Sequence, residues 1–197
     1  MMAPPAWLPL LPAFAAAAAF ALGNRRVQRV IGRSPDVFGR GGDDALNFLG
    51  RAHRGAAAAC AAGLLLGAAG EGPAAVTGWA GVIAMAAGAG LLAWAQRAMG
   101  KSWRVGIDAA PTGLVTSGPF ALSRNPTFLG FLLLFAGAAL AAPGPLTAVA
   151  LGAALVSFPA QVRLEEAHLA ALHGDAWRAY AARIRRWFGR VQRRVTA

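Results

Sequence analysis

All 19 lysine and arginine residues of the chain lie in three segments that alternate with long apolar runs. One basic segment follows the first apolar run, the second follows the third run, and the last follows the fifth. Membrane proteins concentrate Lys and Arg in their cytoplasmic loops and tails, because cations resist translocation. The pattern therefore predicts a membrane protein with an odd number of spans, its N-terminus outside and its C-terminus in the cytoplasm.

The apolar runs contain mostly Ala, Leu and Gly, in a chain that is 57% hydrophobic and 14% charged with a mean hydropathy of +0.49. A span needs about 20 helical residues, so the shorter runs must extend into polar flanks or cross a thinned bilayer. We expect an all-α integral membrane protein with about five transmembrane helices. The expected spans are Ala6–Leu22, Gly55–Ala69, Pro73–Ala95, Phe128–Ala142 and Leu146–Val162.

The net charge of +11 and the isoelectric point near 11.8 are also typical of nucleic-acid-binding proteins. Because every cation falls on one predicted side, we assign the charge to topology and to anionic lipid instead. The expected partner is therefore the lipid bilayer, with no nucleic acid. The bias toward Ala, Gly and Arg indicates a bacterial inner membrane, and nothing in the sequence indicates an oligomeric state.

Two features of the N-terminal half bear on metal binding, disulfide formation and cleavage of the first span. Cys60 is the only cysteine, so we expect neither an internal disulfide nor a zinc cluster, and no metal site. Small residues at Ala17–Ala21 resemble the cleavage region of a signal peptide, which is the alternative to a retained first span. No Lys or Arg precedes this run and Arg25-Arg26 follows it, the reverse of the secretory order, so we expect the span to be retained.

No linker divides the chain, so we expect one membrane-embedded domain over residues 1–197, with three N-terminal spans in 1–100 and a catalytic core in 101–190. Pro143-Gly144-Pro145 predicts a tight antiparallel hairpin between the last two spans. The Gly63–Gly67 spacing and the small residues of Ala86–Gly90 favour close helix packing.

The polar segments are expected to have structure of their own on the cytoplasmic side. Gly100–Arg124 predicts an ordered loop with extended pieces at Trp103–Asp108 and Leu114–Thr116. After the fifth span, Asp175 is a plausible N-cap for a further helix. In that helix the aromatic and aliphatic residues share one face opposite arginines, which is typical of an amphipathic helix lying in the headgroup plane, although a simple membrane anchor explains it equally well. The residues of this face are Trp177, Tyr180, Ile184 and Trp187.

Glu165 and Glu166 follow the fifth span directly. Adjacent carboxylates repel each other and have no topogenic use, so we expect one of them to bind ligand hydroxyls or a cationic ligand. The alternative is a structural salt bridge to Arg163 or Arg124.

Three motifs together resemble the isoprenylcysteine carboxyl methyltransferase and phospholipid methyltransferase group. Gly118-Pro119-Phe120, followed by the segment 124–130 (Arg-Asn-Pro-Thr-Phe-Leu-Gly), is similar to that group's Gly-Pro-Tyr and Arg-His-Pro-x-Tyr-x-Gly signature. The segments 163–169 and 173–187 resemble its second and closing signatures. Asn125 stands where the group has His, and Phe128 where it has Tyr, so two polar contacts to the cofactor are altered.

The resemblance implies a membrane-embedded methyltransferase that uses S-adenosyl-L-methionine. It implies that the substrate is a lipophilic small molecule, a lipidic or isoprenoid-like acceptor at the cytoplasmic face, with a carboxylate as one candidate for the methylated group. It implies that the cofactor-binding residues are Gly118, Pro119, Arg124, Asn125, Pro126, Phe128, Gly130, Glu165, Glu166, Tyr180 and Arg183. Arg163 is the candidate to orient an anionic substrate, with Arg104 and Arg186 behind it, and Glu166 joins Arg163 and Arg104 as a catalytic candidate.

Three alternatives remain open. The first is a phospholipid amine N-methyltransferase, in which arginine near the nucleophile would be less useful. The second is an NADPH-dependent membrane reductase with a similar helical core. The third is a non-enzymatic small membrane protein such as a transporter or scaffold. The expected spans contain no ionisable residue at mid-depth, which argues against an ion or proton pathway.

Overall fold

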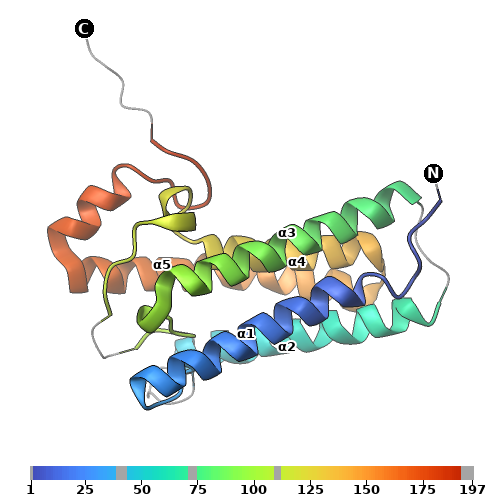
Figure 1. The fold of residues 1–197 in the computed structure, drawn as a ribbon, viewed down its shortest axis with the longest axis horizontal. Coiled ribbons are helices and arrows are strands. Elements are labelled where there is room, and N and C mark those ends of the chain that lie inside the picture. Colours follow the sequence, from blue (N-terminus) through green and yellow to red (C-terminus); the bar gives the residue numbers. More distant parts are fainter. Residues whose placement is uncertain (1, 39–43, 71–74, 109–111, 192–197) are drawn as a thin grey trace, which may run out of the picture.

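The computed structural model describes residues 2–38, 44–70, 75–108 and 112–191, and these residues are mainly helical. Five long helices run back and forth along one axis of the molecule (Figure 1). No β-strand occurs in these described ranges, which confirms the expectation of an all-α protein. The long helices are α1 (Leu10–Ile31), α2 (Asp44–Ala68), α3 (Ala75–Met99), α4 (Pro126–Ala141) and α5 (Pro145–Ala181), and two short 3-10 helices, η1 (Gly100–Ser102) and η2 (Gly118–Ala121), lie between α3 and α4.

Two of the described helices are long and apolar enough to cross a membrane. They are the continuous segment Val76–Ser102, which contains all of α3 except its first residue together with η1, and the helix α5. Helix α4 is apolar but has only 16 residues. Membrane association is thus supported by two helices, whereas five spans and their orientation stay predictions.

Helices α3 and α4 approach so closely that their contact admits only glycine at several positions. A Cβ atom on Gly88 would lie 2.6 Å from the Gly130 carbonyl oxygen, and one on Gly137 would lie 2.6 Å from the Gly81 carbonyl oxygen. Contacts this short do not occur with real side chains, so larger residues would force the helices apart. The close packing expected around Ala86–Gly90 is confirmed.

The predicted hairpin between α4 and α5 is also confirmed. Pro145 occupies the first turn of α5, where its missing N–H costs nothing. The Thr147 hydroxyl donates to the Ala142 carbonyl at 2.8 Å and closes the turn. Helix α2 packs here as well, because Gly63 faces the Thr147 side chain and Gly67 faces Ala142.

The chain after α5 differs from the expected interfacial helix. Helix α5 bends at Gly174, where φ is 51°, and ends at Ala181, so Ile184 and Trp187 lie beyond it. Trp177 and Tyr180 are 6% and 2% exposed, in a small apolar cluster with Phe120 of η2 and residues of α3. This aromatic face therefore packs against protein, because the bend turns the last part of α5 back over η2.

The loop after α3 is ordered by contacts with the end of α1. Asp36 and Val105 form an isolated parallel bridge, and Asp108 accepts hydrogen bonds from Arg33 and Arg104. Of the expected extended pieces, Trp103–Asp108 thus contributes one bridge, and Leu114–Thr116 forms no ladder. Several positions used in the sequence argument lie outside the described residues: Arg40, Pro73, Ala109–Pro111, Arg193 and Arg194.

Candidate active site

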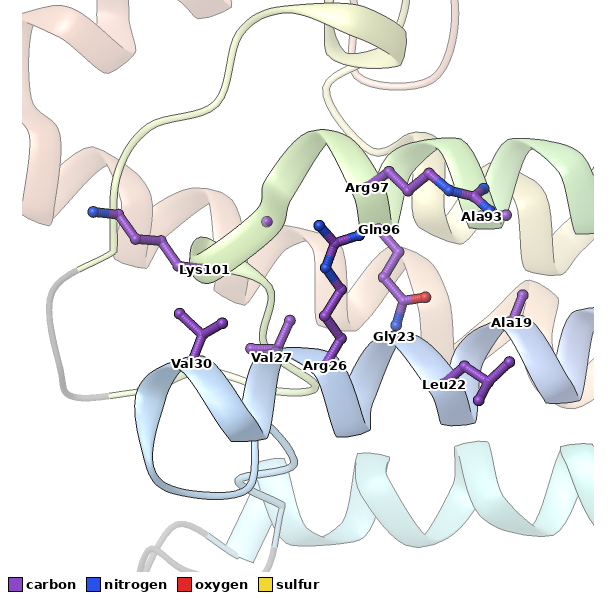
Figure 2. Close-up of a pocket in the computed structure, with 11 residues that line it drawn as sticks. Ala19, Leu22, Gly23, Arg26, Val27, Val30, Ala93, Gln96, Arg97 and Lys101 are labelled. Carbon is purple, nitrogen blue, oxygen red and sulfur yellow. The ribbon is translucent and has the colours of Figure 1, made fainter.

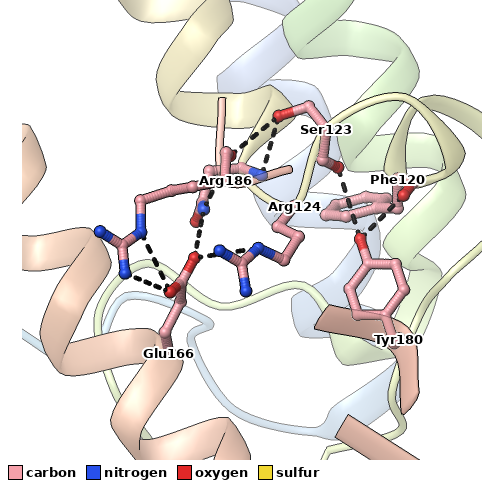
Figure 3. A network of polar contacts seen from close by, with 7 residues as sticks. Phe120, Ser123, Arg124, Glu166, Tyr180 and Arg186 are labelled. Carbon is pink, nitrogen blue, oxygen red and sulfur yellow. Dashed lines mark hydrogen bonds and ion pairs between the residues drawn. The ribbon is translucent and has the colours of Figure 1, made fainter. Parts of the chain in front are cut away.

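Glu166 is the centre of a buried cluster of charged and amide groups at the C-terminal half of α5 (Figure 3). Its Oε2 atom accepts two hydrogen bonds from one guanidinium, Arg186 Nη2 at 2.8 Å and Nε at 3.1 Å. Its Oε1 atom accepts from Asn125 Nδ2 at 3.1 Å. Arg124 Nε lies 3.4 Å from that oxygen, close enough for an ion pair but not aligned for a hydrogen bond. The carboxylate therefore has partners on both oxygens. Its ion pair with Arg124 is one of the two structural salt bridges that the sequence offered as the alternative to ligand binding.

Asn125 is placed by the local fold immediately before α4. It occupies the N-cap position ahead of Pro126, but its side chain makes no capping bond. Nδ2 donates instead to Glu166 and to the Arg186 carbonyl at 3.2 Å. Because an amide supplies two N–H donors, Asn125 serves both acceptors at once.

Ser123 fixes the backbone on which Arg124 and Asn125 stand. It is 2% exposed, and its hydroxyl accepts from the Asn125 backbone N–H at 3.0 Å and donates to the Arg186 carbonyl at 3.3 Å. The Tyr180 hydroxyl donates to the Phe120 carbonyl at 2.8 Å from the other side. The loop is therefore held between α5 and the chain that follows α5.

The segment after α5 folds back to complete the cluster. Arg124 N–H donates to the Arg185 carbonyl at 3.1 Å, and Gly189 N–H donates to the Leu122 carbonyl at 2.7 Å. A bridge between Ile184 and Arg190 closes this turn. Hydrogen bonding to Glu166 raises the pKa of Arg186 further above its usual value, so that this guanidinium stays charged.

Glu165, the neighbour of Glu166 in α5, has a different hydrogen-bond partner. Its Oε1 atom accepts from Gln161 Nε2 at 2.9 Å, one helical turn earlier. Gln161 is fully buried, and its Oε1 atom has no hydrogen-bond partner in the described part of the chain; the same holds for His173 Nε2 and for Arg124 Nε, which has only its ion pair with Glu166. Buried polar atoms normally find hydrogen-bond partners, so Gln161 Oε1 and Arg124 Nε are candidates for contact with a ligand.

The remaining predicted site residues lie outside the Glu166 cluster, in other parts of the fold. Gly118, with a φ of 60°, and the buried Pro119 begin η2 and shape the loop under Tyr180. Gly130 faces α3 and serves helix packing. Arg163 and Arg183 are exposed. Arg104 is bound to Asp108 at 2.6 Å and belongs to the α1–loop contact.

Phe128 belongs to an aromatic cluster under the loop. Its ring centroid lies 5.2 Å from Phe158 of α5 and 6.4 Å from His53 of α2. Without a hydroxyl, Phe128 makes apolar ring contacts where the resembled group has a Tyr. The structure thus brings Arg124, Asn125 and Glu166 together directly, with Tyr180 supporting their loop.

Sequence reasoning gave Arg186 only a secondary role and missed Ser123 and Gln161. Gln161 precedes Glu165 by four residues, a spacing that places both side chains on one face of a helix and could have indicated the contact. Ser123 had no such signal, because its role depends on the fold of the segment after α5.

A scan against family models matches residues 76–176 to Phospholipid methyltransferase, and these residues are more than half of the chain. The chain belongs to the phospholipid methyltransferase family. The match includes α3, α4, most of α5 and the residues Arg124, Asn125, Glu165 and Glu166. Arg186 lies beyond it. No curated protein and no solved structure matches at the threshold applied. Membership confirms the resemblance and indicates a membrane methyltransferase.

Proposed function

We propose that this member of the phospholipid methyltransferase family is an S-adenosyl-L-methionine-dependent methyltransferase that acts on a lipidic acceptor at the cytoplasmic membrane surface. The observation that carries the proposal is the buried cluster of Glu166, Arg124, Asn125 and Arg186 at the polar end of a helix able to span a membrane. Such groups are costly beside a bilayer and mark functional sites. The proposed location is a bacterial inner membrane, with the N-terminus outside.

The donor and acceptor groups around Glu166 fit S-adenosyl-L-methionine. The cofactor carries an ammonium, a carboxylate and ribose hydroxyls, which need an anion, a cation and hydrogen-bond acceptors, respectively. Gln161 Oε1 and Arg124 Nε are buried atoms without a hydrogen-bond partner among the described residues, although Arg124 Nε is ion-paired with Glu166. Glu165 is a carboxylate with one amide partner. We assign Arg124 to the carboxylate, and Glu165 with Gln161 to the ammonium or hydroxyls. When bound, the cofactor supplies an electrophilic methyl group on a sulfonium.

Glu166 has a positioning role in this proposal. Because both of its oxygens have partners, it holds Arg124 and Asn125 in place while Glu165 remains available to the ligand. Preorganised groups of this kind contribute to alignment without reorganising during the reaction. Arg163 is exposed on α5, and we assign it to orient an anionic part of the acceptor.

A phospholipid amine is the second candidate acceptor, favoured by the description of the matched family. The two acceptors differ in the nucleophile, a carboxylate oxygen in one and an amine nitrogen in the other. The amine must lose a proton for each methyl group that it gains, whereas a carboxylate need not.

The test uses the purified full chain in vesicles with S-adenosyl-L-methionine that carries a radiolabelled methyl group. Phosphatidylethanolamine is offered in one arm and a farnesylated cysteine with a free carboxylate in the other. Label transferred to the lipid phase in either arm supports the methyltransferase, and base-labile label identifies a methyl ester rather than an N-methyl group. Absence of transfer to both acceptors and to a total bacterial lipid extract would contradict the proposal.

A further inference from the structure

A groove of about 320 Å³ lies between α1 and the end of α3 (Figure 2), and its α3 residues are other than those that pack against Phe120, Trp177 and Tyr180. The α1 residues that line the groove include Ala19, Leu22, Arg26 and Val30. Their spacing of three or four residues puts them on one face of the helix. This face lies outside the residues that match the family, 76–176. The groove is therefore a feature of this chain in addition to the family core.

The floor of the groove is rigid and polar. Gln96 is 6% exposed, and its Nε2 donates to the Phe20 carbonyl at 3.2 Å and to Asn24 Oδ1 at 3.3 Å. A Cβ atom on Gly23 would lie 2.0 Å from Gln96 Oε1, so a larger residue at position 23 would displace the Gln96 amide. Trp103 Nε1 also donates to Asn24 Oδ1, at 2.7 Å. The close approach of α1 and α3 is thus fixed by direct hydrogen bonds.

The walls combine three cations with apolar surface. Figure 2 shows Arg26 rising from α1 toward Gln96, Arg97 lying along α3, and Lys101 at the far end of the groove. All three are exposed, and none of them forms an ion pair with a residue of the described chain. Other cations of the chain do have such partners, as Arg33 and Arg104 have in Asp108.

The apolar part of the groove faces outward. Leu22 and Val30 are 64% and 67% exposed beside the cations. Water disfavours this combination, but the boundary of a bilayer satisfies it, because acyl chains cover the apolar residues while phosphate reaches the cations. A free phosphate or a nucleotide would use the cations and leave the apolar wall uncovered.

We propose that the α1–α3 groove binds an anionic phospholipid of the cytoplasmic leaflet, with its phosphate at Arg26, Arg97 and Lys101 and an acyl chain along Ala19, Leu22 and Ala93. The site is separate from the Glu166 cluster, since none of the residues that line the groove belongs to that cluster. Its ligand is bound and released without chemical change.

The test measures lipid retained by the full chain in detergent micelles, using native mass spectrometry with phosphatidylglycerol or phosphatidylcholine added. The expected preference for phosphatidylglycerol is about tenfold, from about 1 kcal/mol for each basic residue near an anionic surface, discounted for exposure. The variant Arg26→Gln/Arg97→Gln/Lys101→Gln loses this preference. The matched control Arg25→Gln/Arg29→Gln/Arg51→Gln removes three cations that do not line the groove and retains it.

A second variant tests the apolar half of the groove with every charge intact. Ala93→Phe fills the wall beside the cations, and it lowers phosphatidylglycerol retention at least threefold. Equal losses in the groove variant and in its control would overturn the proposal in favour of diffuse surface charge. Inorganic phosphate at 10 mM that abolishes the preference would overturn it in favour of a free-phosphate site. Equal retention of the two lipids by the native chain would also overturn it.

Discussion

Replacing Glu166 by alanine removes the group on which the two arginines and Asn125 converge. Glu166 is 8% exposed, and its side chain accepts three hydrogen bonds, two of them from Arg186. The substitution leaves Arg124, with a side chain 15% exposed, as a largely buried cation without its anion. Breaking a buried pair from one side is strongly destabilising for this reason.

The expected loss is about 2 to 4 kcal/mol of unfolding free energy. A hydrogen bond to a charged group is worth about 1.5 to 3 kcal/mol, but the Arg186 side chain is 39% exposed and recovers much of its share from water. In the variant, the Asn125 amide still donates one of its two hydrogens to the Arg186 carbonyl. Most of the loss therefore comes from Arg124. Glu166→Gln keeps one acceptor oxygen without the charge and loses about half as much.

Unfolding titrations with sodium dodecyl sulfate in mixed micelles, followed by tryptophan fluorescence, measure these differences. Asp175→Ala is the matched control, since it also removes one carboxylate paired with an arginine, Arg178, from α5. The Asp175 side chain is 96% exposed, so the control should lose less than about 0.5 kcal/mol. A Glu166→Ala variant as stable as this control would refute the reasoning that the cluster is buried and coupled.

Three further predictions concern the supports of the site. Tyr180→Phe removes the bond to the Phe120 carbonyl and should lower the unfolding free energy by about 1 kcal/mol in the same titration, with no loss indicating an exposed hydroxyl. Gly137→Ala forces α3 and α4 apart and should cost about 1 to 3 kcal/mol, whereas Gly90→Ala, with open space around its Cβ, should be neutral or stabilising; equal effects would contradict the packing. Asn125→His should retain cofactor affinity in titration calorimetry, whereas Asn125→Leu should weaken it by about 1 to 3 kcal/mol; unchanged affinity in the Leu variant would remove Asn125 from the site.

The sequence predicted those parts of the fold that local patterns determine. Apolar runs indicated the helices, and Pro143-Gly144-Pro145 indicated the α4–α5 hairpin, because proline and glycine act on the backbone where they stand. The end of α5 was predicted less well. The spacing of Trp177 and Tyr180 described an amphipathic face, but periodicity cannot say whether protein or lipid covers that face.

The site was predictable where its residues lie within motifs and not where the fold brings distant segments together. Arg124 and Glu166 were chosen from their motifs, and the structure places them in contact. Arg186 became the closest partner of Glu166 only because Gly174 bends the chain and residues 183–191 return to the loop. Arg104 was predicted to belong to the site, but its guanidinium forms an ion pair with Asp108, four residues later, and lies in the α1–loop contact.

Binding of S-adenosyl-L-methionine to the purified full chain tests the central claim most directly. Isothermal titration in detergent should give a dissociation constant of about 1 µM to 1 mM, the range of enzyme substrates, with no heat from NADPH at the same concentrations. Arg124→Gln should weaken this binding by about 1 to 3 kcal/mol. Binding of NADPH without binding of S-adenosyl-L-methionine would contradict the account and favour the reductase.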